Sequence, residues 1–137
     1  MNAFTALHVF LYQLTGGKIG GRFRGAPVLL LTTTGRKSGK RRTTPLLYIT
    51  DGGKYAVVAS NGGKPRDPSW WNNLKKKNPR AEIQLRSSRK SMVARHCTQE
   101  EKAKYWPLLA EMYPAYNDYQ EKTDREIPIV LLEPVPS

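Results

Sequence analysis

The residues best suited to chemistry lie in one short stretch, TTTGRKSGKRRTT, at residues 32–44. Five cations fall within seven residues of it: Arg36, Lys37, Lys40, Arg41 and Arg42. Like charges placed this close repel one another, so their concentration indicates an anionic ligand that offsets the repulsion. Arginine can grip phosphate or carboxylate oxygens bidentately, while Gly35 and Gly39 permit a tight turn and a close backbone approach.

The whole chain is basic, with 137 residues and a formal net charge of +12. The charge is uneven, because residues 1–50 carry eight cations and no acid, whereas residues 97–137 carry four cations and eight acids. The length, with 39% hydrophobic and 25% charged residues, is typical of one globular domain spanning residues 1–137. Nucleic acid, an anionic membrane surface and a polyanionic small molecule all fit this charge as partners.

Cysteine usage and the N-terminus bear on location. The single cysteine, Cys97, excludes an internal disulfide and favours a reducing compartment. Residues 1–15 lack the basic region and cleavage site of a signal peptide, and no apolar run approaches the roughly 20 residues that cross a bilayer. We therefore expect a cytoplasmic protein.

The elements that must position the basic stretch are mainly short strands. Strands are predicted over residues 27–34, 41–50, 54–60, 81–85, 89–96 and 127–134. Residues 35–40 form the turn between the first two, and an edge position or a bulge is expected at Pro45, because proline donates no ladder hydrogen bond. Tight turns without β-α alternation predict an α+β fold, mainly an antiparallel sheet or small barrel with added helices.

Helices are predicted over residues 2–14, 69–77 and 99–112, with helix or turn continuing to about residue 123. Asp67 is expected to cap the second, and Thr98 with Glu101 forms a capping box for the third.

The first predicted helix is unusually apolar. Its residues Phe4, Leu7, Leu11 and Leu14 follow the spacing of one helix face, and it has no charged side chain. Two interpretations stay open for residues 1–15: a helix packed on the domain, and a lid or membrane-surface helix.

Several familiar sites are excluded. GRKSGK departs from the phosphate-loop pattern, because Arg41 stands where serine or threonine belongs and a strand follows where a helix is needed. No dinucleotide-binding glycine motif follows a strand. The adjacent His96 and Cys97 point to opposite faces of a strand, so no metal site is expected. Nothing marks a nucleophile and its base, which leaves a binding protein or an enzyme whose cofactor supplies the chemistry.

A family resemblance favours the second possibility. The run LLLTTTGRKSGKRRTTPLLYI, the strand ending VVASNGG, the segment DPSWWNNLKKKNP and the tail YWPLLAEMYPAYNDYQ with TDREIPIV closely resemble the deazaflavin-dependent nitroreductases. The match runs from about residue 20 to 134. The resemblance implies a split β-barrel related to the FMN-binding split barrels. It also implies hydride transfer from reduced coenzyme F420 to a quinone such as menaquinone, and adventitiously to nitroimidazoles.

The resemblance also assigns a cofactor site. Coenzyme F420 carries a phosphodiester and a polyglutamate tail, which explains the cations of the opening stretch. Carried over position by position, the cofactor-binding residues are Arg36, Lys37, Arg42, Thr44, Pro45, Ala59, Ser60, Asn61, Lys64, Trp70 and Asn73. The first three meet the phosphate or tail, whereas Lys40 and Arg41 are expected to be solvated. One of Trp70 and Trp71 is expected to serve mainly in core packing.

Tyr113, Tyr116 and Tyr119 recur every three residues, so one helix face could present all three. The resemblance places matching tyrosines in the acceptor pocket with Ser60, whereas an aromatic packing stripe is the alternative. Family members often have lysine at the position of Asn61, which puts the tail affinity and acceptor preference in doubt.

Three other functions compete with this one. A nucleic-acid-binding module would use the same charge, an FMN or haem protein would use the same barrel, and a cofactor carrier would bind F420 without turnover. We favour the reductase, with a small-molecule acceptor, no nucleic acid, and either a monomer or a homodimer.

Overall fold

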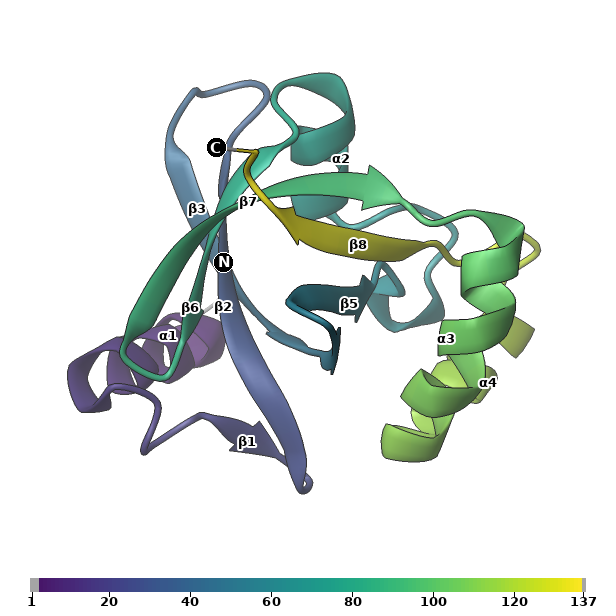
Figure 1. The fold of residues 1–137 in the computed structure, drawn as a ribbon, viewed down its shortest axis with the longest axis horizontal. Coiled ribbons are helices and arrows are strands. Elements are labelled where there is room, and N and C mark those ends of the chain that lie inside the picture. Colours follow the sequence, from purple (N-terminus) through teal and green to yellow (C-terminus); the bar gives the residue numbers. More distant parts are fainter. Residues whose placement is uncertain (1–2, 137) are drawn as a thin grey trace.

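The structure, a computed structural model, describes residues 3–136 and consists of a curled antiparallel sheet flanked by helices (Figure 1). The strands are β1 (Arg22–Phe23), β2 (Ala26–Thr34), β3 (Arg41–Leu47), β4 (Ile49–Asp51), β5 (Lys54–Val58), β6 (Arg80–Leu85), β7 (Ser88–His96) and β8 (Ile129–Pro134). Every pairing is antiparallel, so the predicted α+β class with a mainly antiparallel sheet is confirmed.

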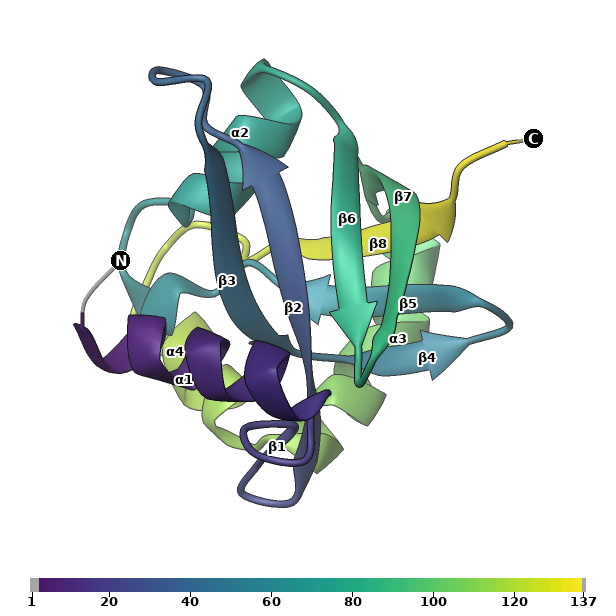
Figure 2. The same cartoon turned by 90° about the vertical axis from the view of Figure 1, so that its left-hand side faces the viewer.

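The sheet bends along its length. Its hydrogen-bonded order is β1-β2-β6-β7-β8-β5-β4, and β3 pairs with β2 alone. Figure 2 shows β2, β3, β6 and β7 running together on one side, while β8, β5 and β4 cross behind them. Of the edge or bulge expected at Pro45, the structure shows the edge: Pro45 lies opposite Leu30 on β3, which pairs with β2 off the main path of the sheet.

Within the described residues, four α-helices flank the sheet: α1 (Ala3–Thr15), α2 (Ser69–Lys76), α3 (Gln99–Met112) and α4 (Ala115–Glu121). A 3₁₀ turn, η1 (Asn61–Gly63), follows β5. The predicted capping box at α3 is confirmed, since the Glu101 N–H donates to Thr98 Oγ1 (3.2 Å) and the Thr98 N–H donates to Glu101 Oε1 (2.8 Å). The predicted cap at α2 is wrong, because Pro68 occupies that position and the Asp67 carboxylate pairs with cations instead.

The core lies on both sides of the bend. Leu29, Val57 and Ile83 are fully buried between the two halves of the sheet and α2. A second cluster lies under α3 and α4, where Leu109 and Ile127 are fully buried. The helices α3 and α4 are therefore fixed to the sheet by apolar packing, which holds the tyrosines between them in place.

Helix α1 is anchored to the barrel by Tyr12. The Tyr12 hydroxyl lies 3.0 Å from the Val28 carbonyl oxygen and 3.1 Å from that of Gln84, and it accepts a hydrogen bond from the Arg86 N–H (2.8 Å). This anchor fits the packing interpretation of α1. Asn2, where the predicted helix began, lies outside the described residues.

The opposite side of α1 faces solvent. Leu7, Phe10 and Leu14 are 54%, 58% and 69% exposed. Among residues 3–136, no helix is long and apolar enough to cross a membrane. The apolar residues seen in the sequence thus divide between a buried side that docks α1 and an exposed side.

Candidate active site

The basic stretch forms a well-defined hairpin turn between β2 and β3. The Gly39 N–H donates to the Gly35 carbonyl (2.9 Å), and the Gly35 N–H donates to the Lys40 carbonyl (2.7 Å). Gly39 has a φ of +72°, a conformation that glycine adopts at little cost. The turn thus follows from its glycines. Arg36, Lys37 and Lys40 lie in the turn itself, whereas Arg41 and Arg42 begin β3.

Helix α2 holds this turn from one side. The buried amide of Asn73 accepts two hydrogen bonds from Arg36, one from the backbone N–H and one from Nη1, both 3.1 Å long. The Asn73 Nδ2 donates to Thr33 Oγ1 at the end of β2 (3.2 Å). One side chain therefore joins the helix, the strand and the basic turn.

A groove of about 600 Å³ lies between the turn, β3 and α2. It is lined by six of the residues predicted to bind the cofactor: Arg36, Lys37, Arg42, Thr44, Trp70 and Asn73. Trp71 is buried and packs edge-on against the His96 ring, outside the residues that line the groove. With three cations at one end and an indole in its wall, this groove suits a ligand with an anionic part and a flat apolar part.

A second cavity, of about 300 Å³, begins where the groove ends along β3. Among its lining residues are Pro45, Ser60, Tyr113, Tyr116 and Tyr119. Thr44 and Pro45 are consecutive residues of β3, and one lines the groove while the other lines the cavity. The two hollows are therefore neighbours along one strand.

The three tyrosines come together, but not on one helix as predicted. Helix α3 ends at Met112, Tyr113 lies at the junction, and α4 begins after Pro114, which supplies no N–H to continue α3. The rings of Tyr113 and Tyr116 are 5.0 Å apart between centroids, and the Tyr113 and Tyr119 hydroxyls are hydrogen-bonded at 3.3 Å. The break between the helices, rather than helical spacing, gathers the rings.

Two of these tyrosines, Tyr113 and Tyr116, have a raised pKa and stay protonated well above neutral pH. Burial raises the pKa of Tyr116, and the neighbouring Tyr113 and Tyr119 raise it further. The pKa of Tyr113 is also raised, first by its hydrogen bond to Tyr119 and then by burial. The cavity therefore contains phenol O–H groups that can donate hydrogen bonds to a ligand.

The backbone after β5 has an unusual conformation. Ser60 is right-handed (φ −78°, ψ −34°), whereas Asn61 and Gly62 have φ of 48° and 64°. Such an alternation turns consecutive N–H groups toward one concave side and forms an anion-binding nest. In the described part of the chain, no hydrogen bond uses the N–H groups of Ser60, Asn61 and Gly62. Ser60 and Gly62 both line the cavity.

Three of the predicted cofactor residues line neither hollow. Ala59 is fully buried, and its N–H donates to the Pro128 carbonyl (2.9 Å). The Asn61 side chain is turned toward its own loop, where Nδ2 donates to the Arg66 carbonyl (3.1 Å). Lys64 is exposed.

Sequence reasoning missed other residues of the site. His8 of α1 and Phe23 of β1 line the cavity, and the N-terminal segment therefore forms part of its wall. Arg125, which precedes β8, binds the loop after β5. Arg125 stands in the TDREIPIV segment that resembles the family, and it is one of few cations in the acidic C-terminal part of the chain. That isolated positive charge was the sequence signal that could have identified it.

Metal chemistry finds no support in this site. Within residues 3–136, no three or more His, Cys, Asp or Glu side chains are grouped to hold a metal ion. The curled antiparallel sheet, with a basic groove beside an aromatic cavity, has the architecture of a split barrel with a binding site for an anionic ligand. The chain belongs to the family of F420H(2)-dependent quinone reductases, which matches it over residues 5–134.

Relatives and solved structures agree with this assignment. An F420H(2)-dependent quinone reductase of Mycobacterium tuberculosis is 43% identical over 130 residues, which are 92% of this chain and 87% of the relative. A solved structure described as a domain-swapped dimer superposes with a TM-score of 0.74 at 42% identity, covering 93% of this chain and 94% of the other. The solved structure of an F420-H2-dependent reductase, FDR-A, superposes with a TM-score of 0.71 at 46% identity. The match covers 78% of this chain and 94% of the other. The predicted family, split-barrel fold and F420 dependence are confirmed.

The site fits this cofactor. The cations of the turn suit its phosphodiester and carboxylates, and the indole of Trp70 suits a flat ring. The nest adds N–H groups that no protein acceptor uses in the described residues, and these suit ring carbonyls.

Proposed function

We propose that this protein reduces a quinone of the menaquinone type with reduced F420, and that nitroaromatic compounds are adventitious acceptors. The observation that supports this most is the adjacency of Thr44 in the cationic groove and Pro45 in the tyrosine cavity. A ligand that fills the groove and reaches past β3 would present its ring to whatever occupies the cavity. Direct transfer needs such contact between donor and acceptor.

The groove residues would hold the cofactor by charge and shape. Arg36, Lys37 and Arg42 would meet its phosphate or tail, and the exposed Lys64 would be a fourth cation for the phosphate. Thr44 and Pro45 would lie along the ring, and the backbone N–H groups of Ser60 and Asn61 would meet its pyrimidine edge. The predicted contact from Ala59 is not proposed, because its N–H and C=O are bonded to Pro128 and Arg125. Trp70 and Asn73 would close the groove from α2.

The cavity residues would receive the acceptor. When bound, reduced F420 supplies a hydride from carbon 5 of its ring, and a quinone that accepts it becomes an anion. Tyr116, whose raised pKa keeps its proton in place at neutral pH, would donate a hydrogen bond to the developing oxyanion. Ser60, Tyr113 and Tyr119 would orient the acceptor, and the final proton would come from water.

The outer side of α1 would bring the enzyme to its acceptor. Menaquinone is a membrane lipid, and Leu7, Phe10 and Leu14 form an uncharged apolar surface on a helix that also contributes His8 to the cavity wall. We therefore place the protein in the cytoplasm at the inner face of the membrane. It would be a monomer or a homodimer, and the domain-swapped relative makes a dimer the form to look for first.

Membrane binding is tested by flotation with liposomes. The triple variant Leu7→Gln, Phe10→Gln, Leu14→Gln should float less than the unaltered protein, because it removes apolar area while leaving the Tyr12 anchor. Leu108→Gln, at a residue 48% exposed on α3, is the control. Equal flotation of all three proteins would contradict membrane docking through α1.

Turnover is tested by mixing the protein anaerobically with reduced F420 and a menaquinone analogue. The expected result is oxidation of reduced F420 that requires both the enzyme and the quinone. The return of the visible absorbance of oxidised F420 measures this oxidation. Nicotinamide cofactors and reduced FMN should not replace F420. Binding of F420 without turnover across quinones and nitroaromatics would instead favour a cofactor carrier.

A further inference from the structure

Arg125 is bonded to the backbone of the loop that forms the nest. Its Nη2 donates to the carbonyl oxygens of Ala59 (3.2 Å) and Ser60 (2.8 Å), and its Nε donates to that of Lys64 (3.0 Å). Its Nη1 pairs with Asp67 Oδ1 (3.0 Å), and only 17% of its side chain is exposed. The guanidinium therefore gathers the carbonyl oxygens of one loop around a partly buried positive charge.

The bonded carbonyls belong to the peptide groups that form the nest. The Ala59 carbonyl shares its peptide plane with the Ser60 N–H, and the Ser60 carbonyl shares its plane with the Asn61 N–H. In a trans peptide the N–H points away from the C=O, so both N–H groups point away from the guanidinium. A hydrogen bond to a charged donor polarises a peptide group and makes its N–H a stronger donor.

We propose that Arg125 is a positioning residue that shapes and polarises the Ser60–Gly62 nest, so that the nest binds negative charge on the F420 ring. This inference rests on the proposed function. Arg125 acts through the two peptide groups, because four of its five guanidinium N–H groups are bonded to three carbonyls and a carboxylate. The positive charge is thus transmitted to the cofactor without contact.

The same residue links the two hollows. The Arg125 carbonyl accepts a hydrogen bond from Gln120 Nε2 of α4 (2.8 Å), the helix that presents Tyr116 and Tyr119 to the cavity. Its partner Asp67 also pairs with Lys75 of α2 (2.7 Å), the helix that lines the groove. Asp67 is therefore in direct contact with the guanidinium, and Lys75 contacts the same carboxylate.

The ionisation of bound F420 provides the test. Oxidised F420 loses its 8-hydroxyl proton, its absorption spectrum changes, and the negative charge spreads through the conjugated ring to the pyrimidine carbonyls. The apparent pKa of this chromophore, measured with excess protein, reports how well the nest stabilises the anion. Affinity for F420 is measured separately by tryptophan quenching, and folding by thermal unfolding.

Arg125→Gln should raise the pKa of bound F420 and weaken its binding about tenfold, as expected when hydrogen bonds to a charged group lose strength. Arg125→Lys keeps the charge but loses the planar set of donors. Its chromophore pKa and its affinity for F420 should lie between those of the unaltered protein and those of Arg125→Gln. Asp67→Asn should shift the chromophore pKa in the opposite direction, because it removes the carboxylate that offsets Arg125. A merely structural role of Arg125 does not predict opposite shifts.

Arg95→Gln is the matched control, since the Arg95 guanidinium is likewise held by carboxylates, those of Glu101 and Glu133, and Arg95 lines neither hollow. It should lower stability without changing the chromophore. A folded Arg125→Gln with unchanged chromophore pKa and affinity would overturn the proposal. If Arg125→Gln does not fold, an unchanged chromophore in Asp67→Asn would overturn it. Failure of the unaltered protein to bind F420 would instead overturn the proposed function itself.

Discussion

Arg36 and Asn73 are joined by two hydrogen bonds to a single amide oxygen, one from the Arg36 backbone and one from its guanidinium. Asn73 is only 4% exposed and is itself held by Thr33. The basic turn is therefore fixed against α2 before any ligand arrives. Such preorganisation lowers the ordering cost of binding a flexible polyanion.

The first prediction concerns this link. Asn73→Leu keeps the branched shape of the side chain but removes both acceptor and donor, so the turn loosens and F420 binding should weaken about tenfold, the effect of one or two hydrogen bonds. Tryptophan quenching measures the affinity, since Trp70 lies in the groove wall. Asn72→Leu, on the same helix but outside the groove, should bind normally. Equal affinities for the two variants would show that Asn73 does not organise the site.

The second prediction concerns the acceptor cavity. Tyr116→Phe removes one phenol O–H and should reduce kcat for quinone about tenfold while leaving the affinity for F420 unchanged. Steady-state kinetics with varied quinone and saturating reduced F420 measure this. Tyr55→Phe removes a hydroxyl that is bonded to Lys90 and lies outside the cavity, so it should have little effect. A fall in F420 affinity with constant kcat would place Tyr116 on the cofactor side.

The third prediction concerns the contact between η1 and α4. Gly63 has a φ of +81°, and a Cβ added there would lie 2.8 Å from the Tyr119 carbonyl oxygen. Gly63→Ala should therefore lower the free energy of unfolding by about 2 kcal/mol or more. Gly52→Ala, where φ is +57° and no atom lies within 4 Å, isolates the backbone contribution. Urea unfolding of both variants measures the difference, and equal losses would show that η1 is free to move from α4.

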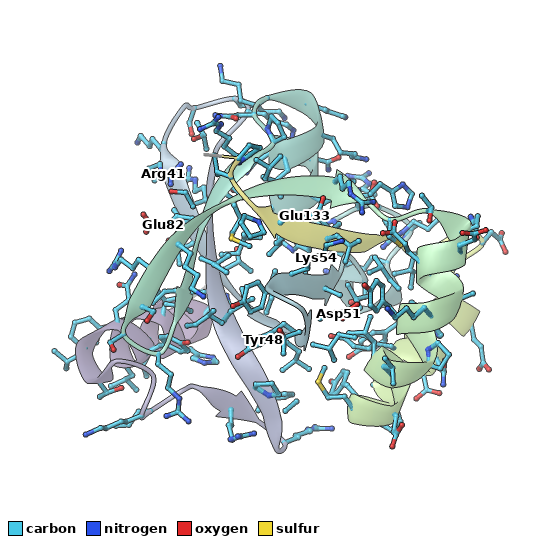
Figure 3. The ribbon with its side chains drawn as sticks, viewed as in Figure 1. Arg41, Tyr48, Asp51, Lys54, Glu82 and Glu133 are labelled. Atoms are coloured by element: carbon cyan, nitrogen blue, oxygen red, sulfur yellow. The ribbon has the colours of Figure 1, made fainter. Side chains whose placement is uncertain are left out.

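The fourth prediction concerns pH. Hydrogen bonds from Arg95, with a smaller contribution from the Thr98 backbone, lower the pKa of Glu101 to about 2. A carboxylate with a lowered folded-state pKa contributes stability above its ordinary value near 4.5, and this is lost as the pH falls toward 2. Arg95 also pairs with Glu133, which lies beside Lys54 (Figure 3).

Glu101→Gln should therefore flatten the fall in stability between about pH 5 and pH 2. Solvent screens the 39% exposed Arg95, so we expect the loss at neutral pH to be about 1 kcal/mol. Urea unfolding at several pH values measures both effects, with Glu100→Gln as the control. A profile as steep as that of the unaltered protein would show that Glu101 does not control this window.

Much of the fold was predictable because its signals are local. The glycines of the turn, the proline of β3 and the capping box of α3 each fix the nearby backbone, and all three appear as expected. Asp67 misled the prediction because its carboxylate pairs with two cations, Lys75 in the last turn of α2 and Arg125 in a distant part of the chain. A capping rule does not weigh such ion pairs.

The site was predicted through residue types rather than through geometry. The groove gathers six of the expected residues, since they lie on β3, the adjacent turn and α2. The arrangement of the tyrosines across a helix break, and the contribution of His8 and Phe23 to the cavity, depend on how α1 and α4 pack on the sheet. The role inferred for Arg125 required the positions of four acceptor oxygens, which no spacing in the sequence reveals.

The most direct measurement is a tryptophan-quenching titration of the unaltered protein with F420 and, separately, with FMN. We expect saturable binding of F420, weak binding of FMN, and a loss of F420 affinity of about tenfold in Lys37→Ala but not in Lys40→Ala, because Lys37 lines the groove and Lys40 does not. Binding of F420 that Lys37→Ala leaves unchanged, or preferential binding of FMN, would contradict the assignment of the basic groove to this cofactor.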